Sequence, residues 1–398
     1  MKILAVCQHY YPEPFVIYKI MEQLVSFGHE VHVVTGLPNY GYHRIMDGYN
    51  PKGNIDEIIN GVHVHRVKIY PRKESKLSIC KNYLSYWINS KKYVKTLGDS
   101  FDLVFSMTLS PVISASAGNL YSKKHKVPHI HYCVDLWPES LVITNVIKPK
   151  GLIYDFFYKW SRNIYKHADK LLVSSPSFID YFKNVLKLDS LDYGVFPQPC
   201  LEVKKIENPI EYKENTINIV YCGNMGKVQA LNHVYEAMEE YKGKDIYFHF
   251  IGMGSEKEKF FNEVKERGLE NQVIDHGPLP SSKAASYFVN ADALYVSLTN
   301  NGYVGKTIPN KLMFYLSFGK PLIAMVDHDA RDLLKETDGA LIVDQSTTSL
   351  VEAIGKFMKL TKEEKEKLGH NNQVYYQTYF TLESLSRKLE EEMLALKK

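Results

Sequence analysis

The sequence of 398 residues predicts an α/β protein made of two doubly wound, Rossmann-like domains. Two observations lead to this fold class. Short apolar runs alternate with helical segments, which is typical of a parallel sheet covered on both faces. The pattern begins at residue 2 and starts again near residue 217. At about 150 residues per domain, the length also fits two domains. We expect the two domains to face each other across a cleft.

The first half is predicted to begin with a buried strand and a helical stretch over residues 16–27, which Gly28 ends. Further apolar runs continue the alternation. The predicted strands are Lys2–Cys7, Glu30–Val34, Val62–Val67, Leu103–Ser106, His129–Val134 and Leu171–Ser174.

The second half repeats this arrangement, with a helix expected near residues 229–242 after the first strand. Its predicted strands are Ile217–Tyr221, Tyr247–Ile251, Val273–Asp275, Ala293–Ser297, Pro321–Ala324 and Ala340–Val343.

The boundary between the halves is predicted at the proline-rich segment Phe196–Pro199, which a charged stretch follows. The last helix, Leu382–Leu396, has an apolar stripe that can pack on a core. We therefore expect an N-terminal domain over residues 1–198, a C-terminal domain over 199–378, and a terminal segment over 379–398.

The charge of the chain is uneven, although the net charge is only +4. Residues 1–200 hold 24 Lys and Arg against 16 Asp and Glu. A basic half suits a phosphate-bearing partner or a membrane surface, whereas nucleic acid would need clustered contacts that are not found. The 29 tyrosines and 18 phenylalanines also suggest a sugar site or an interface.

The five cysteines are scattered without a CxxC pair, so reduced thiols in a cytoplasm are expected rather than disulfides or a zinc frame. No apolar run approaches the roughly 18 residues of a transmembrane helix, and the start lacks the layout of a signal peptide. We expect a cytoplasmic protein.

Two glycine-containing loops follow strands of the second half. Gly223-Asn224-Met225-Gly226 lies between a strand and a helix, where backbone N–H groups and the helix dipole can bind a diphosphate. Gly252 and Gly254 repeat the arrangement after the next strand. A plain structural turn explains either loop equally well.

A third loop, Gly302 to Lys311, contains Lys306 and Lys311 and precedes a helix. Lysines at a helix start oppose the dipole, so their presence suggests an anion nearby. Solvated surface lysines are the alternative.

Asp135, Trp137 and Glu139 follow a strand of the first half. Two carboxylates and an indole suit sugar hydroxyls and ring faces. The alternative places Trp137 in the core and makes Glu139 a helix N-terminal charge.

Histidine pairs occur on single strand faces, His63 with His65 and His129 with His131. Such pairs are more often packed or surface residues than metal ligands. Asp327-His328-Asp329 matches a metal-binding DxD only weakly, so no metal is expected.

Two segments mix lysine with aromatic residues, at 81–97 and 148–170. Basic aromatic helices can lie on an anionic membrane. Packing of an amphipathic helix on the core explains them equally well.

Motifs along nearly the whole chain resemble those of family 4 glycosyltransferases of bacterial surface-polysaccharide synthesis. The nearest branch includes the colanic-acid and fucosamine-type transferases. The resemblance rests on five segments in order, namely Gln8–Glu13, Gly36–Tyr40, Asp135–Ser140, Tyr221–Gly226 with Gln229, and Pro309–Lys311 leading to Gly319–Pro321.

The resemblance implies the GT-B fold, a retaining transfer without metal or other cofactor, and a last helix that returns to the first domain. It places a nucleotide sugar, a UDP-sugar in the simplest case, on the C-terminal domain, and a lipid-linked saccharide of capsule, O-antigen or exopolysaccharide synthesis on the other. The enzyme would lie at the inner face of the cell membrane. Together with the loops described above, the candidate catalytic residues are Asp135, Lys306 and Lys311. The candidate donor-binding residues are Gly223, Asn224, Met225, Gly226, Gln229, Gly252, Gly254, Pro309 and Asn310, and the candidate acceptor-binding residues are Glu13, Pro38, Asn39, Trp137 and Glu139.

One departure from the family is visible. The family often has E-x7-E ahead of the GKP stretch, and its second glutamate holds the donor ribose. Lys306 and Phe314 occupy the matching positions here, and Phe314 cannot accept a hydrogen bond.

The expected mechanism follows from the charge that grows on the departing β-phosphate. The N–H groups near Gly223–Gly226, with Lys306 and Lys311, would stabilise it. Asp135 would orient the acceptor hydroxyl or assist its deprotonation. Two other functions fit the same fold, a non-hydrolysing sugar-nucleotide epimerase and an inactive protein that binds a sugar nucleotide.

Overall fold

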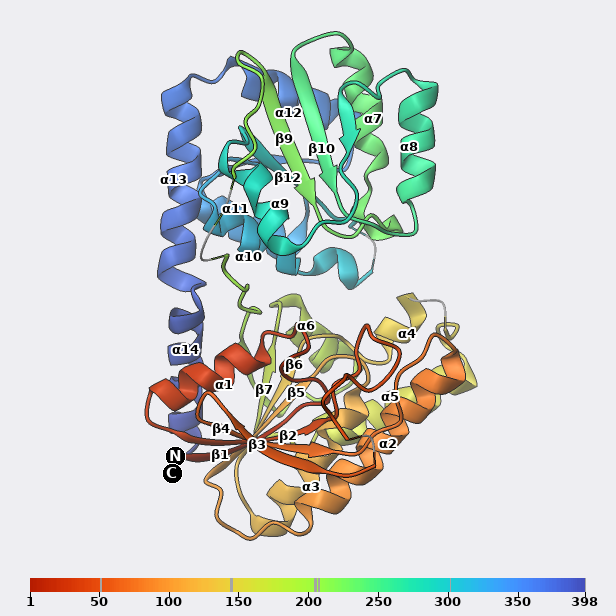
Figure 1. The fold of residues 1–398 in the computed structure, drawn as a ribbon, viewed down its shortest axis with the longest axis vertical. Helices are drawn as coiled ribbons and strands as arrows, with labels where there is room; N and C mark the ends of the chain where they lie inside the picture. The colour runs from red at the N-terminus through yellow and green to blue at the C-terminus, as the bar shows by residue number, and fades with distance from the viewer. Residues whose placement is uncertain (51, 144–145, 204–205, 207, 301, 398) are drawn as a thin grey trace. The chain divides into compact units, whose positions relative to one another are not determined.

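A computed structural model of the chain describes residues 1–397 except 51, 144–145, 204–205, 207 and 301. The chain divides into two units. Unit 1 comprises Met1–Gln198 and Leu382–Lys398, and unit 2 comprises Pro199–Thr381. Each unit is a parallel-sheet α/β domain with helices on both faces of its sheet (Figure 1).

Unit 1 contains an eight-stranded sheet with the order β3-β4-β2-β1-β5-β6-β7-β8, in which only β3 is antiparallel to its neighbour. The strands are β1 Lys2–Val6, β2 Glu30–Gly36, β3 Ile55–Ile59, β4 Val62–Val67, β5 Leu103–Thr108, β6 His129–Cys133, β7 Lys170–Val173 and β8 Asp192–Val195.

The helices of unit 1 follow the strands in the expected alternation. They are α1 Ile17–Ser26, α2 Lys76–Val94, η1 Val112–Ala115, α3 Ser116–His125, α4 Glu139–Ile143, α5 Leu152–Tyr165, α6 Ser177–Asp180, η2 Tyr181–Val185 and α14 Leu382–Leu396.

Unit 2 contains a six-stranded parallel sheet with the order β11-β10-β9-β12-β13-β14. The strands are β9 Ile217–Cys222, β10 Ile246–Ile251, β11 Val273–Asp275, β12 Ala293–Ser297, β13 Leu322–Met325 and β14 Ala340–Val343.

The helices of unit 2 cover both faces of this sheet. They are η3 Lys227–Gln229, α7 Asn232–Met238, η4 Glu239–Tyr241, α8 Lys257–Glu266, α9 Ser281–Val289, η5 Val304–Lys306, α10 Asn310–Ser317, α11 His328–Thr337, α12 Thr347–Lys359 and α13 Lys362–Tyr379.

All twelve predicted strands are present, and two strands were missed. β3 has the sequence Ile-Asp-Glu-Ile-Ile and alternates between partly buried and exposed residues, so it lacks a continuous apolar run. β8 is four residues long and includes Gly194. The α-helix expected near 229–242 is shorter, because Gln229 ends η3, α7 spans only Asn232–Met238, and Glu239–Tyr241 form η4.

The core of each unit lies between its sheet and the flanking helices. On one face of the first sheet, Leu4, Val6 and Val34 pack against Tyr86 of α2 and Tyr121 of α3. Both tyrosine side chains are completely buried. Fully buried parallel strands explain why the first sheet could be predicted from apolar runs alone.

The terminal helix α14 belongs to unit 1. Its Leu385, Leu389 and Met393 are buried. Glu390 forms an ion pair of 2.7 Å with His29, whose other ring nitrogen lies 3.1 Å from the N-terminal amine. The helix therefore closes the core of unit 1 next to the first residue of the chain.

Candidate active site

Lys311, the second residue of α10, lies beside the carboxyl end of β9. Its ammonium donates a hydrogen bond of 2.8 Å to the Tyr221 hydroxyl and lies 4.0 Å from the centroid of that ring. A Cβ atom on Gly223 would lie 2.8 Å from Nζ, so glycine at this position leaves room for the ammonium. The loop and the lysine that the sequence suggested separately are therefore adjacent.

The electrostatics of Lys311 favour an anion. Burial lowers the pKa of Lys311 to about 7, although nearby Cys222 opposes the shift. Part of the side chain still reaches solvent. Within the part of the chain that the structure describes, no carboxylate forms an ion pair with this lysine. A desolvated ammonium without a counter-ion gains strongly from a bound phosphate.

The position of α10 is set by Tyr315, a residue that sequence reasoning missed. Its hydroxyl accepts a hydrogen bond from Cys222 N at 2.7 Å and donates one to Cys222 O at 2.9 Å. The helix begins directly after Pro309, and Asn310 at its start is exposed. The two Tyr315 bonds hold the start of α10, and with it Lys311, at the end of β9.

The loops after β9 and β10 pack backbone against backbone. Gly252 has a φ of +152°, and a Cβ atom there would lie 2.0 Å from Gly223 O. A Cβ atom on Gly254 would lie 2.3 Å from Met225 O. Glycine is therefore required at both positions because the two loop backbones lie so close together. This agrees with the structural-turn interpretation that the sequence left open.

The backbone N–H groups of the Gly223–Gly226 loop correct the expected mechanism. Gly223 N donates to Ile251 O at 2.9 Å, and Met225 N donates to Met253 O at 2.8 Å. Gly226 N donates to the Gln229 side chain at 2.9 Å. Three of the four groups are thus already used within the protein, and Met225 is fully buried. The cation Lys311, rather than this cradle, is the main group available to a phosphate.

Replacing Gly252 with alanine is expected to destabilise unit 2 by at least ~2 kcal/mol, because the new Cβ would overlap Gly223 O in a backbone conformation that is itself strained. Gly243→Ala is the matched control, since Gly243 has a φ of +78° and no atom within 4 Å of its Cβ position. It should cost only ~1 kcal/mol. Urea unfolding measures the free energy of unfolding of both variants. Equal losses of stability would contradict the close approach of Gly252 to Gly223.

A depression of about 760 Å³ opens at the carboxyl ends of β9, β10 and β11. Across it, Lys257 and Asp275 form an ion pair of 2.9 Å, and Met253 is 62% exposed. The lining residues are Asn224, Met253, Gly254, Lys257, Glu258, Phe261, Asn262 and Asp275. Asn224 and Gly254 were predicted for the donor. The others were not predicted; Met253 lies in the loop after β10, Asp275 ends β11, and the remaining residues come from α8.

The remaining residues predicted for the donor side contact other parts of unit 2. Lys306 ends η5 with its ammonium 5.6 Å from the centroid of the Tyr303 ring. Gln229 accepts the Gly226 N–H, as described above, and so shapes its own loop. Phe314 packs against Phe288 and Phe318 at ring distances of 5.6 and 5.0 Å. The residue at the usual ribose-binding position thus contributes to an aromatic cluster.

Glu13 follows β1 in unit 1 and is completely enclosed. Its carboxylate accepts hydrogen bonds from Asn39 N at 2.8 Å and Tyr40 N at 2.6 Å, and it pairs with His9 at 3.0 Å. Burial raises the pKa of Glu13, but these hydrogen bonds outweigh burial, and the pKa is lower than usual. With 1% of its surface exposed, Glu13 holds the Pro38–Tyr40 loop and orients His9.

Pro38 and Asn39 are also buried. Asn39 is inaccessible to solvent, and its side-chain oxygen accepts from Arg72 N at 2.9 Å and from Asn82 Nδ2 at 3.1 Å. Its amide donates to Leu37 O at 3.0 Å. The side chain therefore fixes the loop and is not free to bind an acceptor.

Asp135 lies two residues beyond β6, and its side chain is exposed. Enough protein nonetheless surrounds the carboxyl group that desolvation raises its pKa, although a backbone hydrogen bond from Ser110 opposes the shift. A carboxyl group with a raised pKa that remains open to solvent is suited to accept a proton.

Trp137 and Glu139 adopt the alternative roles left open by the sequence. Trp137 is 4% exposed, and its indole donates a hydrogen bond of 2.8 Å to Ser110 Oγ. Glu139 is the first residue of α4 and accepts hydrogen bonds from Tyr154 at 2.6 Å and Tyr181 at 3.2 Å. Neither offers the ring face or the free carboxylate expected for a sugar.

Ser110 and His9 were missed as members of this site. A small cavity of about 20 Å³ at the carboxyl ends of β1 and β5 is lined by both residues, together with Cys7, Gln8, Phe15, Ile17, Met107, Leu109 and Ser114. The spacing of His9 and Glu13, four residues apart after a strand, could have indicated the pair. Ser110 has no such signal, because its role depends on the neighbouring strand β6.

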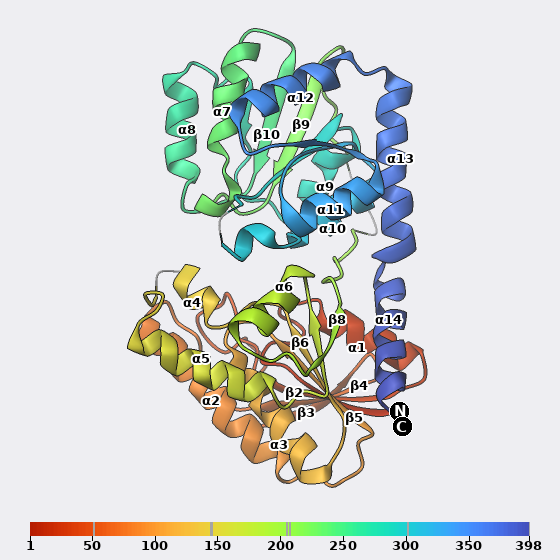
Figure 2. The same ribbon diagram turned by 180° about the vertical axis from the view of Figure 1, so that it is seen from behind.

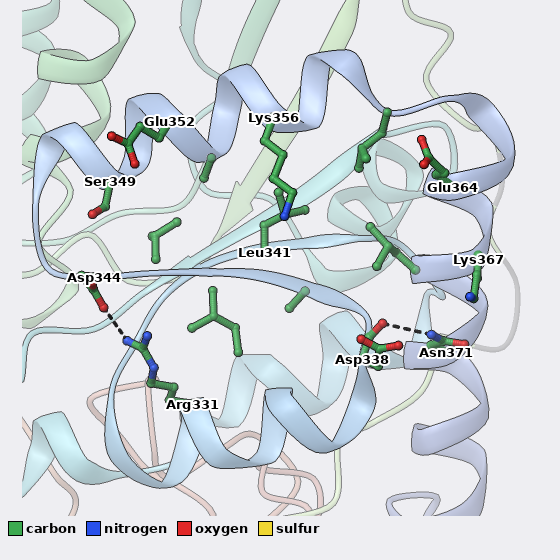
Figure 3. Close-up of a pocket in the computed structure, with 16 residues that line it drawn as sticks. Arg331, Asp338, Leu341, Asp344, Ser349, Glu352, Lys356, Glu364, Lys367 and Asn371 are labelled. Carbon is green, nitrogen blue, oxygen red and sulfur yellow. Dashed lines mark hydrogen bonds and ion pairs between the residues drawn. The ribbon is translucent and has the colours of Figure 1, made fainter.

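A separate groove of about 610 Å³ runs along β14, the edge strand of the second sheet (Figure 3). It is bordered by α12 and α13, and Lys356 points into it above Leu341. Arg331 bonds Asp344 at 2.8 Å across one end. The groove follows the side of the sheet, away from Lys311, and it contains none of the predicted site residues.

The family of the chain is shown by two family models. Residues 15–197 match the model described as "Glycosyl transferase 4-like domain", and residues 202–374 match "Glycosyl transferases group 1". Together they span nearly the whole chain, which therefore belongs to the group 1, family 4 glycosyltransferases.

Two curated bacterial proteins are related to part of the chain. The probable glycosyltransferase WbjE of Pseudomonas aeruginosa is 26% identical over 212 residues, which cover 49% of this chain and 50% of WbjE. The putative colanic acid biosynthesis glycosyl transferase WcaI of Escherichia coli is 26% identical over 30% of this chain and 28% of WcaI. The matched segments thus span half or less of each relative.

Solved structures confirm the GT-B fold. Sucrose-phosphate synthase from Thermosynechococcus elongatus matches with a TM-score of 0.75 at 15% identity, over 100% of this chain and 99% of that one. HepE from Anabaena, in complex with UDP-glucose, matches with a TM-score of 0.64 at 11% identity, over 99% and 100%.

Proposed function

We propose that this protein is a retaining glycosyltransferase that moves a sugar from a nucleotide sugar, in the simplest case a UDP-sugar, to a hydroxyl of a lipid-linked saccharide. The observation that carries the proposal is Lys311, a half-buried cation without an ion-pair partner among the described residues, beside a glycine at the end of β9. Family membership supports sugar transfer, and HepE, which binds UDP-glucose, supports the donor class.

The donor is assigned to unit 2. Its diphosphate would meet the Lys311 ammonium, and the depression that Asn224, Gly254 and Lys257 line would take the rest of the nucleotide. Because Phe314 cannot accept a hydrogen bond, the ribose hydroxyls need another partner, and the carboxylates of Glu258 and Asp275 both line the same depression.

The transfer step follows from these assignments. The bond between the anomeric carbon and the β-phosphate oxygen breaks, and its electron pair leaves with the phosphate, where Lys311 stabilises the new charge. The acceptor oxygen bonds to the same face of the carbon. Its proton passes to a phosphate oxygen or, with Asp135 as base, to that carboxylate.

The reaction is tested by incubating the protein with UDP-sugars and a polyprenyl-diphosphate-linked saccharide, followed by mass spectrometry and NMR of the product. A lipid-linked product that keeps the anomeric configuration is expected. Conversion of the donor to its epimer without acceptor would instead show an epimerase. Tight nucleotide binding without turnover would show a binding protein.

A membrane surface is the second partner that we propose, and unit 1 supplies the candidate face. α2 and α5 lie side by side (Figures 1 and 2). The ring centroids of Trp87 on α2 and Trp160 on α5 are 6.1 Å apart. Apolar side chains on α2, α4 and α5 and in the segment between α4 and α5 are exposed, among them Leu77, Leu84, Ile88, Ile143, Val146, Leu152, Ile153 and Phe156. Lys76, Lys81, Lys148, Lys150 and Lys159 are exposed in the same segments.

This face matches an anionic bilayer, because apolar side chains can enter the headgroup region while lysines meet the lipid charge. No helix in the described residues is long and apolar enough to cross a membrane. A peripheral location at the inner face of the cell membrane, in capsule, O-antigen or exopolysaccharide synthesis, completes the proposal.

Replacing Leu152 and Ile153 together with aspartate should remove most binding to vesicles that contain anionic lipid. Leu152 is 90% exposed and Ile153 62%, so folding should survive. Val374→Asp is the control, because Val374 is 45% exposed on α13 of unit 2. Sedimentation with vesicles at low and high salt measures the effect, as each surface lysine is worth ~1 kcal/mol on an anionic membrane. Equal binding to neutral vesicles would contradict the electrostatic part.

A further inference from the structure

A cluster of three histidines and two carboxylates lies on one face of the first sheet, near the amino ends of β2 and β4. His32 is paired with His63 in the register of these strands, and their rings stack at 4.5 Å. His65 stacks on His32 at 5.3 Å. Glu30 and Asp56 complete the cluster, which is far along the strands from the loops that hold the candidate active site.

Four of these side chains form a linear chain of contacts. Glu30 Oε1 lies 2.9 Å from His32 Nε2, and His32 Nδ1 lies 3.0 Å from His65 Nε2. His65 Nδ1 lies 2.7 Å from Asp56 Oδ1. Each of the three contacts requires one hydrogen atom between its two heavy atoms.

The hydrogen atoms do not suffice for this chain. A neutral imidazole carries one N–H, so His32 and His65 supply two hydrogens, and ionised carboxylates supply none. Glu30 Oε1 also accepts from the Lys2 ammonium at 2.9 Å, so this oxygen acts as an acceptor. One contact therefore places two lone pairs against each other unless a further cation enters the cluster.

That cation is either a proton on an imidazole or a metal ion. Lys2, 2.9 Å from Glu30, compensates the charge of that carboxylate from outside.

The geometry points to a divalent transition-metal site, and we propose that Glu30, His32 and His63 bind Zn²⁺ or a similar ion. One ligand atom from each of the three residues lies within 4.8 Å of the others. Tetrahedral zinc with bonds of about 2.0–2.1 Å to nitrogen needs ligand atoms ~3.4 Å apart, so the stacked rings of His32 and His63 would rotate to direct one nitrogen each at the ion. Water would fill the fourth position.

The surroundings provide the second shell that such sites use. A metal-bound histidine usually donates its other N–H to a neighbouring acceptor. Here His32 Nδ1 would donate to His65 Nε2, and His65 Nδ1 would donate to Asp56 Oδ1. With the metal on His32 Nε2, the ion lies between Glu30 and His32, and each of the other two contacts of the chain has one hydrogen atom. The expectation of no metal rested on His63 and His65 of one strand. His32 and Glu30, which lie on the neighbouring strand, were not part of that pattern.

The site would fasten the edge of the sheet, because its ligands come from β2 and β4 and its support comes from β3. It is independent of the proposed transfer reaction, since none of its residues lies at the carboxyl ends of the strands. A protein without sugar-transfer activity could therefore still bind the ion.

Titration calorimetry of the full chain with ZnCl2, after removal of metals with EDTA, tests the proposal. We expect one equivalent to bind, and at least tenfold weaker binding in His32→Gln and in His63→Gln. His276→Gln is the matched control, because His276 contacts His249 at 3.0 Å in unit 2. It should bind zinc like the wild type. Equal affinity in wild type and in a His32→Gln, His63→Gln double variant would overturn the site.

A second measurement needs no variant. Co²⁺ added to the metal-free wild type should give the intense visible absorption of a four-coordinate ion, and thermal unfolding should shift upward with ZnCl2. A spectrum identical to that of Co²⁺ in buffer would also overturn the proposal.

Discussion

Replacing Lys311 with alanine is expected to lower the rate of sugar transfer by about 100- to 1,000-fold at saturating donor, as removal of a group that stabilises developing negative charge typically does. The loss should be severe because the Gly223, Met225 and Gly226 N–H groups already have partners and cannot replace the ammonium. Steady-state kinetics with a UDP-sugar measure the effect.

Lys320→Ala is the matched control, because Lys320 is another lysine of unit 2 whose pKa is lowered by burial. It should keep nearly the wild-type rate. If Lys311→Ala and Lys306→Ala both transfer at wild-type speed, neither lysine contacts the donor diphosphate.

The pH dependence of donor affinity should distinguish the contribution of the charge of Lys311 from that of its shape. With a pKa of about 7, its ammonium is charged below neutral pH and loses its proton above it. Affinity for a nucleoside diphosphate should therefore fall as pH rises through 7. In Lys311→Arg this fall should disappear, because guanidinium stays charged.

The same lysine should reduce stability. Its pKa is lower in the folded state than the ordinary 10.5, so the unfolded chain binds more protons between pH 7 and 10.5. The loss of folding stability that Lys311 causes is complete below pH 7 and disappears as pH rises towards 10.5. Lys311→Met should thus raise the melting temperature most at low pH while transfer is lost.

Replacing Asp135 with asparagine is expected to reduce transfer about 100- to 10,000-fold if the carboxylate accepts the acceptor proton, and much less if it only orients a hydroxyl. Asparagine preserves size and can still accept the Ser110 hydrogen bond. Donor affinity and melting temperature should therefore remain unchanged.

Asp189→Asn, an exposed substitution elsewhere in unit 1, controls for a general loss of charge. A helix-capping role for Asp135 predicts no loss of rate with asparagine, which caps well. Since α4 begins four residues later at Glu139, the structure gives capping little support. Wild-type transfer by the variant would remove Asp135 from the site.

The twelve predicted strands were accessible to sequence reasoning because a doubly wound parallel sheet buries both faces of its strands. β3 was not, since it is an antiparallel edge strand with Asp56 and Glu57 among its isoleucines. Edge strands lack the continuous apolar run, and β8 is too short to show one.

The site was only partly predictable, for reasons of tertiary contact. The sequence indicated Gly223 and Lys311 as separate phosphate-binding features, but their adjacency depends on Tyr315, which holds α10 at the end of β9. Which N–H groups remain free depends on the contacts between the β9 and β10 loops. The enclosure of Glu13 and Asn39 likewise follows from loops that lie far apart in the sequence.

The terminal helix α14 has a consequence for the order of synthesis. Unit 1 consists of the first 198 residues and the last 17. During translation, all of unit 2 emerges from the ribosome before Leu385, Leu389 and Met393 can complete the core of unit 1. The nascent N-terminal segment must therefore persist with an uncovered apolar surface until α14 has emerged, a period in which chaperones can bind it. Unit 2, being continuous, can finish folding first.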